Sequence, residues 1–388
     1  MPWKECVIVE QRMEFVRRSY EPGVVFKSLC QEYGISPKTG YKWLNRFELE
    51  GNPGLSDRSR RPRRHSHQLS EPEVCEMVKF KLAHPSWGPR KIREVYRRSH
   101  GVAPSESSFK RVLARAGLTQ KRRKRFVRCV DGPRPCISIQ EPNDVWTVDF
   151  KGWWLTDTRQ RCEPLTVRDE RSRYLLTIKA MRTSRTAPVR SVFEELFAEY
   201  GLPRWIRSDN GSPFACIHSP PRLSPLSVWW ISLGIGVDRI DPGCPTQNGG
   251  HERMHLDIRR ELQGMIEGDL DDHQSAFDAW RQEFNWERPH DSLGMRVPGE
   301  AYSKSTREYK GTPEDLFYPI DMLRRRVSLA GKLCINNQEY FLSRSLRGVD
   351  LGLRPSPQRR YQAWLGDFVL GVIDETTVSM DWAVPPSP

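Results

Sequence analysis

Two short apolar runs in the middle of the chain each end in an aspartate, and this pattern constrains the fold more than any other feature. The first run, V-W-T-V-D-F, carries Asp149, and the second, W-I-R-S-D-N-G, carries Asp209 and leads into a turn. Short apolar runs bounded by turn signals are typical of buried strands. Because strand and helix patterns alternate between residues 143 and 300, we expect a mixed α/β sheet covered by helices on both faces.

A third carboxylate, Glu252, lies in the stretch P-T-Q-N-G-G-H-E-R-M-H at Pro245–His255. We expect Asn248 to cap a helix that begins there. Alone, a Glu at a helix start is usually explained by the helix dipole. Beside two strand-end aspartates, however, it completes a carboxylate group suited to two Mg²⁺ ions, which prefer oxygen ligands. Such a pair of ions can activate an attacking oxygen and stabilise a leaving oxygen in phosphoryl transfer.

Four ordered motifs surround these carboxylates. They read W-x-x-D-F at Trp146–Phe150, S-D-N-G-S-P-F at Ser208–Phe214, Q-N-G-x-x-E-R-x-H at Gln247–His255 and F-N-W-E-R-P-H-D-S-L at Phe284–Leu293. The first three resemble the signatures of the DDE transposase and retroviral-integrase superfamily. The fourth resembles a segment of its bacterial insertion-sequence branch.

The resemblance implies a ribonuclease-H-like catalytic core in which the first and fourth strands are adjacent and bring Asp149 beside Asp209. It implies a DNA transposase that cuts and joins phosphodiesters, with Asp149, Asp209 and Glu252 as catalytic residues and metal ligands. Two Mg²⁺ ions per active site are the expected cofactor, with Mn²⁺ able to substitute. The spacing between Asp209 and Glu252 is 42 residues, longer than is usual in the superfamily. We assign the extra residues to a proline-rich loop at Cys216–Pro225.

Positive charge is concentrated in the first third of the chain. Residues 1–136 hold 30 Lys and Arg against 14 Asp and Glu, whereas the remainder is close to neutral. A basic region joined to a near-neutral one indicates a polyanion-binding part beside a chemistry domain. The alternative is a basic surface that only confers solubility. We expect residues 1–130 to form an autonomous DNA-binding region.

Residues 1–50 are predicted to form a helix-turn-helix domain. The apolar spacing predicts helices over Ile8–Tyr20 and Val24–Tyr33, and Ser36 followed by a proline predicts a third helix over Pro37–Glu48. In such a domain the third helix enters the major groove, although a plain helical hairpin is the alternative. The candidate DNA contacts are Lys38, Thr39, Lys42 and Arg46.

Two strongly basic segments extend this region. The linker at residues 51–68 is expected to insert arginines into the minor groove or to lie along phosphates, unless it is only a solvated charge run. The connector at residues 119–142 begins near K-R-R-K-R, a run suited to phosphate contact. The candidate residues are Arg58, Arg60, Arg61, Arg63, Arg64, Lys121, Arg122, Arg123, Lys124 and Arg125.

Three further regions complete the predicted organisation. Residues 69–118 are expected to form a second helix-turn-helix-like domain of three helices, and residues 143–300 the integrase-like catalytic core. Residues 316–388 contain short alternating runs separated by turns such as Asn336-Asn337, which predict hairpins. The resemblance to these transposases implies that the hairpins form a small C-terminal β-barrel.

Several polar residues near the carboxylates have open roles. His251 and His255 contact phosphate, lie at the surface or pack in the interior, and Arg253 and Arg259 either guide a DNA end or face solvent. For Arg288 and His290, in the fourth motif, the sequence defines no role. Other nearby carboxylates are expected at the surface or in turns, and they are Asp144, Asp157, Asp169, Asp238 and Asp241.

Cysteine usage and the N-terminal residues bear on the compartment. The nine cysteines form no C-x-x-C pair, and the opening M-P-W-K-E-C lacks the apolar core of a signal peptide. We therefore expect free thiols in a reducing bacterial cytoplasm, with the protein associated with the nucleoid when bound to DNA. The sequence contains no apolar run long enough to predict a membrane span.

The expected partners are double-stranded DNA, as element ends and as target, and further copies of the same chain. Two other functions stay open. One is a catalytically inactive DNA-binding regulator that keeps the fold, and the other is a structure-selective nuclease that shares the metal site.

Overall fold

The computed structural model describes residues 8–58, 69–119, 137–216, 222–240, 248–311, 313 and 316–383. The chain divides into two compact units, Met1–Ser70 and Glu71–Pro388. The second helical triplet therefore groups with the core. We expected residues 1–130 to form one autonomous DNA-binding region, whereas this division places the second triplet with the core, to which ion pairs join it as described below. DNA binding by residues 1–130 stays a prediction.

The first unit is a three-helix module with a small apolar core. Its elements are α1 (Ile8–Ser19), α2 (Phe26–Glu32), α3 (Pro37–Glu50) and a short 3-10 turn, η1 (Asn52–Leu55). Phe15, Leu29, Trp43 and Leu55 are buried together. The Ser36 hydroxyl accepts a hydrogen bond from the Thr39 N–H at 3.2 Å, which confirms the predicted start of α3.

The second unit begins with another helical triplet, here called the second helical module. It consists of α4 (Glu71–Ala83), α5 (Pro89–His100) and α6 (Glu106–Arg115). Met77, Ile92, Phe109 and Leu113 are fully buried in it. Ser105 caps α6, since its side chain accepts from the Ser108 N–H at 3.2 Å.

A mixed sheet follows. Its strands are β1 (Val145–Phe150), β2 (Trp154–Leu155), β3 (Arg161–Asp169), β4 (Leu175–Met181), β5 (Trp205–Ser208) and β6 (Gly236–Arg239). The order is β2-β3-β1-β5-β6, with β4 on β3; β5 is parallel to β1 and β6, and the other pairs are antiparallel. The single strand expected over Trp146–Leu155 is interrupted at residues 151–153, because Gly152 has φ +92°.

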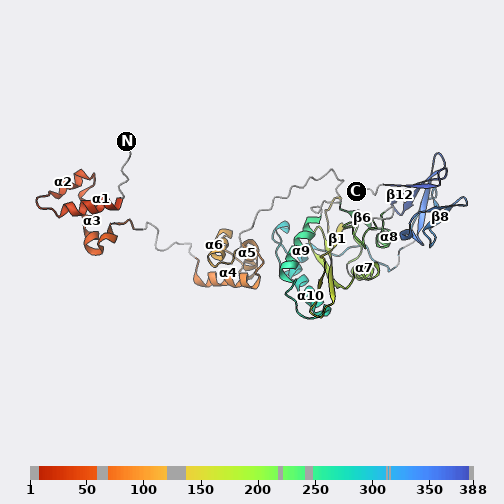
Figure 1. Cartoon of the computed structure of the whole chain (residues 1–388), viewed down its shortest axis with the longest axis horizontal. Coiled ribbons are helices and arrows are strands. Elements are labelled where there is room, and N and C mark those ends of the chain that lie inside the picture. Colours follow the sequence, from red (N-terminus) through yellow and green to blue (C-terminus); the bar gives the residue numbers. More distant parts are fainter. Residues whose placement is uncertain are drawn as a thin grey trace. The chain divides into compact units, whose positions relative to one another are not determined.

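Helices cover both faces of this sheet, as expected (Figure 1). Apolar residues of α7 (Thr186–Tyr200) and α8 (Pro225–Ser232) share a buried cluster with Trp146 and Val148 of β1. On the opposite face, α9 (Gly249–Glu261) and α10 (Leu270–Trp286) share a cluster with Cys162 of β3. The alternation of inward-facing residues along β1 and β3 therefore decides which helices each strand residue meets.

Short elements and a C-terminal β region complete the unit. A turn, η3 (Asp291–Leu293), and a short helix, α11 (Pro298–Ala301), follow α10. The later elements are β7 (Leu323–Arg326), β8 (Lys332–Ile335), β9 (Gln338–Phe341), η4 (Arg344–Leu346), β10 (Asp350–Ser356), β11 (Arg360–Leu365), β12 (Phe368–Asp374) and β13 (Ser379–Trp382).

The C-terminal strands form antiparallel sheets. One has the order β13-β12-β11-β10-β7, and the other is the β8-β9 hairpin, in which Asn336 and Asn337 both have positive φ. Within the described strands, β7 and β13 stay as edges, so the expected closure into a barrel is not shown. Apolar residues of these sheets belong to the same buried cluster as the α7–α8 side of the core. Among the described helices, none has the length and apolarity needed to cross a membrane.

Candidate active site

Asp149 and Asp209 lie at the ends of two neighbouring parallel strands. The register of β1 against β5 pairs Trp146 with Ile206 and Thr147 with Arg207. Asp149 and Asp209 each follow two residues after the last of these pairs, at the same edge of the sheet. The strand adjacency that the family resemblance implied is therefore confirmed.

The turn after β5 fixes the Asp209 carboxylate. Its Oδ1 accepts a hydrogen bond from the Gly211 N–H at 3.1 Å. A Cβ atom on Gly211 would lie 2.9 Å from Asp209 Oδ2, so the D-N-G sequence leaves space for the carboxylate. Farther along, an isolated bridge pairs Ala215 with Leu223, and α8 starts at Pro225, so the assignment of the extra residues to Cys216–Pro225 stays a prediction.

Glu252 lies in the first turn of α9 and its charge reaches Asp149. Burial, together with the negative charges of Asp209 and Glu252, raises the pKa of Asp149 to about 7, against the lowering effects of a backbone hydrogen bond from Phe150 and of the Lys151 charge. The Asp149 carboxylate therefore interacts electrostatically with both Asp209 and Glu252. We call these three carboxylates the electrostatic group, and their role as metal ligands stays a prediction.

Two histidines fasten α9 to the sheet. The Thr166 hydroxyl on β3 is 2.9 Å from His251 Nε2 and 2.8 Å from His255 Nε2, and it donates to the Asp149 carbonyl at 2.9 Å. His251 Nδ1 is 2.8 Å from the Thr147 hydroxyl on β1. Burial lowers the pKa of both histidines, so both rings are neutral. Of the roles left open for these histidines, the structure favours interior packing. This packing positions the helix turn that holds Glu252.

The N-terminus of α9 differs from the prediction in one detail. Asn248 occupies the cap position, but its side chain makes no cap hydrogen bond, because its φ and ψ of −119° and 26° lie outside the extended region that caps adopt. The glycine at position 250, by contrast, is required for a steric reason. A Cβ atom there would lie 2.2 Å from the guanidinium of Arg168, which is buried and paired with Glu170.

Among the described residues, no group of three or more His, Cys, Asp or Glu side chains forms a ready-made metal site. The donor chemistry nevertheless fits a hard cation, because the Asp149 carboxylate lies in the field of two further carboxylates and oxygen ligands suit Mg²⁺. His255 Nδ1 is 3.7 Å from Asp149 Oδ2. Since this imidazole is neutral, it does not offset the negative charge of the group.

One cation, Lys151, interacts directly with Asp149. Lys151 interacts electrostatically with both Asp149 and Arg259, and burial lowers its pKa. Arg253, by contrast, is paired with Asp257 at 3.1 Å. Lys151 was missed, although its position two residues after Asp149, past the end of the same strand, could have indicated it.

The nearby aspartates were expected at the surface or in turns, and three of them are not at the surface, although Asp144 lies in the bend before β1. Asp144, Asp169 and Asp238 are buried, and each accepts hydrogen bonds: Asp144 from the Gln140 and Glu141 N–H groups, Asp169 from Asn143 and Ser172, and Asp238 from Arg207 at 2.6 Å. Their carboxylates serve as local caps and ion-pair partners. Asp157 is exposed, as expected, and Asp241 lies outside the described residues.

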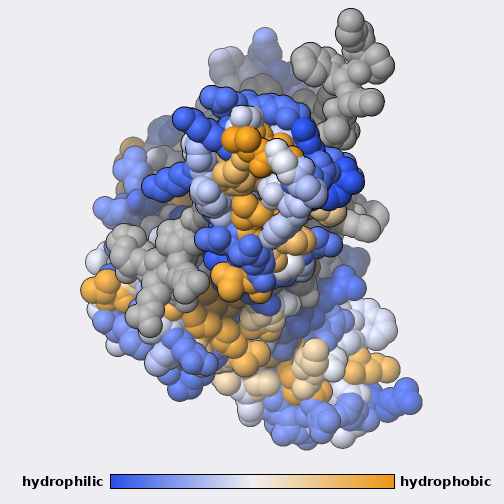
Figure 2. Space-filling model, turned by 90° about the vertical axis from the view of Figure 1, so that its left-hand side faces the viewer, coloured by the Kyte–Doolittle hydropathy of each residue, from blue (hydrophilic) through white to orange (hydrophobic). Residues whose placement is uncertain are grey.

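The candidate DNA contacts on α3 divide into two kinds. Lys38 and Lys42 are exposed, whereas the Thr39 hydroxyl lies 3.0 Å from that of Ser36. The Arg46 guanidinium is half-buried and lies 5.1 Å from the centre of the Trp43 ring. Tyr41 is 56% exposed on the same helix and was missed by sequence reasoning. Figure 2 shows apolar side chains bordered by hydrophilic ones on the face nearest the viewer.

Most of the remaining DNA-binding candidates lie outside the described residues. These are Arg60, Arg61, Arg63, Arg64, Lys121, Arg122, Arg123, Lys124 and Arg125. Arg58 is described, and it forms an ion pair with Glu50 at the end of α3. Its contact with DNA stays a prediction.

The fourth motif lies on the α9–α10 side of the core. Arg288 is 1% exposed and pairs with Asp257 and Glu261 of α9 and with Glu283 of α10. His290 is half-buried, and burial together with the Lys91 and Arg288 charges lowers its pKa to about 3. Arg288 therefore binds the helix that bears Glu252, at its far end from the carboxylate group.

Family models match three parts of the chain. A model described as an integrase core domain matches residues 233–298, which include Glu252 and the fourth motif. A homeodomain-like domain matches residues 39–113, and a helix-turn-helix domain matches residues 11–63. The two helix-turn-helix matches thus cover the helical modules that sequence analysis predicted.

Two curated relatives come from insertion elements. The uncharacterized 39.2 kDa protein of insertion element IS476 from Xanthomonas euvesicatoria is 27% identical over 246 residues, which are 63% of this chain and 68% of the relative. The uncharacterized 31.7 kDa protein of insertion element IS407 from Burkholderia multivorans is 27% identical over 248 residues, which are 60% of this chain and 82% of the relative.

Solved structures of viral integrases show a distant likeness. The catalytic core domain of HTLV-2 integrase in complex with magnesium is 15% identical, covers 42% of this chain and 98% of its own, and has a TM-score of 0.31. The intasome of simian T-cell lymphotropic virus in complex with a PP2A regulatory subunit is 13% identical, covers 76% and 97%, and has a TM-score of 0.34.

Proposed function

We propose, from the premise that the chain is an insertion-sequence transposase of the DDE integrase superfamily, that it cuts DNA at the ends of its element and joins them to target DNA. The observation that carries the proposal is the electrostatic group of Asp149, Asp209 and Glu252. Two of these carboxylates end adjacent parallel strands, and the third raises the pKa of the first.

In this proposal the three carboxylates hold two Mg²⁺ ions, or Mn²⁺ in their place. When bound, such ions activate an attacking oxygen and stabilise a leaving one. The chain's own residues set the geometry. Thr166, His251 and His255 hold the first turn of α9, which bears Glu252, against the sheet. Lys151 and Arg259 provide positive charge for a DNA phosphate beside Asp149.

The proposed partners are element ends, target DNA and further copies of the chain. The first unit would bind the element end through α3, with Lys38 and Lys42 as phosphate or base contacts. Joining two ends to one target requires two active sites, which favours a homo-oligomer. The basic segments at residues 51–68 and 119–142 would add phosphate contacts.

The deciding experiment measures strand joining of a labelled element end that carries a free 3′-OH, with Mg²⁺ or Mn²⁺. Asp149→Asn, Asp209→Asn and Glu252→Gln should each lower joining on the order of 1000-fold or more, because each removes a charge that the cations need. End binding without metal should stay at the wild-type level. A double variant should be little worse than a single one, since residues that act together are not additive.

Asp157→Asn is the matched control, because Asp157 is exposed and Asn keeps an acceptor for the Gly268 N–H. Asp238 is unsuitable, since its loss would leave Arg207 unpaired in the interior. Strand joining at the wild-type level by Glu252→Gln would refute the assignment of Glu252 as the third metal ligand. Cleavage without joined products in the wild type would instead favour a nuclease, and binding with neither activity would favour an inactive regulator.

A further inference from the structure

The second helical module contacts the core through the loop that leads into α5. Trp87, just before α5, is 2% exposed, and its ring stacks on His84 with centroids 3.8 Å apart. The guanidinium of Arg288 lies 5.5 Å from the Trp87 ring. A cation that close to an indole face is attracted by it. Two sequence motifs far apart in the chain, W-G-P-R-K and E-R-P-H-D, therefore meet here.

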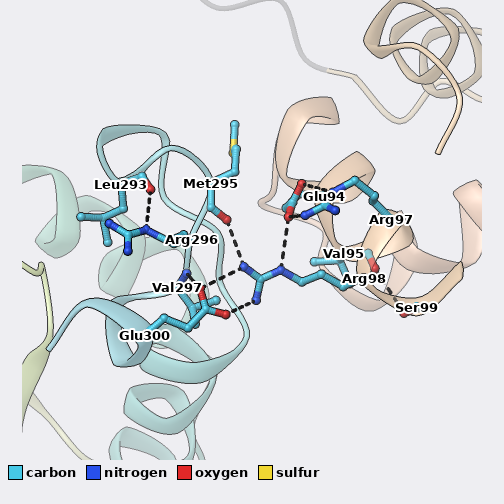
Figure 3. A network of polar contacts seen from close by, with 10 residues as sticks. All are labelled: Glu94, Val95, Arg97, Arg98, Ser99, Leu293, Met295, Arg296, Val297 and Glu300. Carbon is cyan, nitrogen blue, oxygen red and sulfur yellow. Dashed lines mark hydrogen bonds and ion pairs between the residues drawn. The ribbon is translucent and has the colours of Figure 1, made fainter. Parts of the chain in front are cut away.

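Ion pairs surround this contact. Arg90 Nη1 lies 2.7 Å from Asp291 Oδ1, at the start of η3. Arg98, near the end of α5, donates to Glu300 Oε1 at 3.1 Å and to the Met295 carbonyl at 3.2 Å (Figure 3). Basic residues of α5 thus face acidic residues of the core. We call this set of contacts, from Trp87, Arg90 and Arg98 to Arg288, Asp291 and Glu300, the clamp.

Directed polar contacts, rather than continuous apolar packing, make up the outer part of the clamp. A cavity of about 320 Å³ remains between α5 and the loop at Gly294–Arg296. Lys91 lies in the same region, and burial and the Arg288 charge lower its pKa to about 8. Charge-assisted hydrogen bonds fix orientation more sharply than apolar contact does. The clamp is therefore suited to holding the module at one angle.

The clamp continues into the helix that bears Glu252. Arg288 touches Trp87 on one side and pairs with Asp257 and Glu261 on the other. Both acids belong to α9, as does Glu252. Because Arg288 is 1% exposed and is also flanked by Trp280 and Phe284, its guanidinium has little freedom to move. A shift of the module would therefore be felt by α9.

We propose that the second helical module is a positioning device that is held on the core of the same chain by the clamp and sets, through Arg288 and α9, where Glu252 lies relative to bound DNA. This inference rests on the proposed function for its consequence but not for the clamp itself. Since α6 is packed on α5, DNA held by the module would keep a fixed distance from the carboxylates. The cut would then fall at one phosphate.

The first test measures hydrogen–deuterium exchange of the full chain without DNA or metal. Trp87→Ala removes the indole contact of the clamp with Arg288 and leaves the pairs of Arg288 with α9 in place. We expect faster exchange in α9 in this variant and in Glu300→Gln. Arg97→Ala is the matched control, because Arg97 neighbours Arg98 but pairs with Glu94 within α5. Unchanged exchange in both α9 and α5 would overturn the clamp, whatever the enzyme's activity.

The second test maps cut positions by sequencing the 3′ ends released from an element end. For Trp87→Ala and Glu300→Gln we expect about a 10-fold to 100-fold loss of joining, as for a small misplacement of reacting groups. The cuts should spread over neighbouring phosphates, and end binding should stay within about twofold. Loss of joining with a single unchanged cut position would show a merely structural role. Exchange in β3 reports whether each variant is folded.

If the wild type neither cuts nor joins, the proposed function fails while the exchange test still decides the clamp. If the wild type joins and the variants retain both exchange and cut position, the positioning role fails while the proposed function stands.

Discussion

The two helical modules are alike in sequence and different in surroundings. Each has three helices, a buried tryptophan and a capping serine before its third helix. In the first unit, Lys38 and Lys42 are exposed on α3, where the Lys42 Nζ lies 4.5 Å from the centre of the Trp43 ring. In the second module, Arg90 and Arg98 of α5 pair with Asp291 and Glu300 of the core. The same residue types therefore meet solvent in one module and carboxylates of the same chain in the other.

This difference shows what clustered positive charge does and does not indicate. The excess of Lys and Arg over residues 1–136 predicts an anionic partner. It does not say whether that partner is DNA or an acidic patch of the folded chain. Part of the charge expected to bind DNA is used to hold the second helical module on the core. The number of phosphates that the basic region neutralises should be correspondingly smaller.

Among the tests that compare the two modules, the largest expected effect is on the salt dependence of DNA binding. Lys38→Ala with Lys42→Ala should weaken end binding about tenfold or more and lower the log–log salt slope by about 1.8, or about 0.9 for each phosphate that is no longer neutralised. Arg90→Ala with Arg98→Ala should leave the slope unchanged, because these arginines pair with carboxylates. Fluorescence anisotropy across a salt series, without metal, measures both. An equal fall in slope for the two pairs would show that α5 also reads DNA.

Much of the catalytic core could be predicted because its signals are local. Short apolar runs that end in Asp149 and Asp209 predict strands, and the spacing around Glu252 predicts a helix start. The adjacency of β1 and β5 did not follow from periodicity and required the family resemblance. Likewise, the hairpin at Asn336-Asn337 could be predicted from its turn residues, whereas the order of the C-terminal sheet could not.

The features that escaped prediction depend on contacts distant in sequence. Asp169 and Asp238 are polar, so sequence alone places them at the surface, yet Asn143 and Arg207 satisfy them in the interior. Arg288 shows the same limit, since its partners on α9 and α10 and its contact with Trp87 arise only when three segments meet. Whether a charged residue is buried depends on which residues the fold brings next to it.

A smaller effect separates the units by pH. The pKa of Asp149 in the folded chain is about 7, above the ordinary 3.8, so its contribution to stability is full below pH 4 and is lost as the pH rises through 7. Asp149→Asn should therefore stabilise the metal-free second unit more at pH 8 than at pH 6, by about 2–4 °C in Tm. The buried histidines have lowered pKa values, which change stability with pH in the opposite direction. Their contribution cancels when the Tm of the wild type is subtracted from that of the variant at each pH.

The first unit provides the internal control for this measurement. Its described residues, 8–58, contain no histidine, and the pKa of Glu32 is lowered by its hydrogen bond to Arg18. Stability from such a group is lost only as the pH falls through its lowered pKa, well below 6. Calorimetry should show a first-unit transition that is the same at pH 6 and pH 8. Added Mg²⁺ should raise the Tm of the wild type and not that of Asp149→Asn. A rise in the Tm of Asp149→Asn but not of the wild type would contradict the proposed role of Asp149 as a metal ligand.

The smallest expected effect concerns Tyr41, which is exposed on α3 between Lys38 and Lys42. Its ring packs on Phe26 with centroids 4.4 Å apart, so Tyr41→Phe keeps this packing and removes only the hydroxyl. If that hydroxyl donates to a phosphate, end binding should fall about twofold to fivefold, as for one neutral hydrogen bond, and stability should not change. Tyr20→Phe is the control, because the Tyr20 hydroxyl already bonds to Glu48 at 3.1 Å. Equal binding by Tyr41→Phe and the wild type would assign DNA binding by α3 to its lysines, and an equal loss in both variants would point to a change in the module rather than to a missing hydrogen bond.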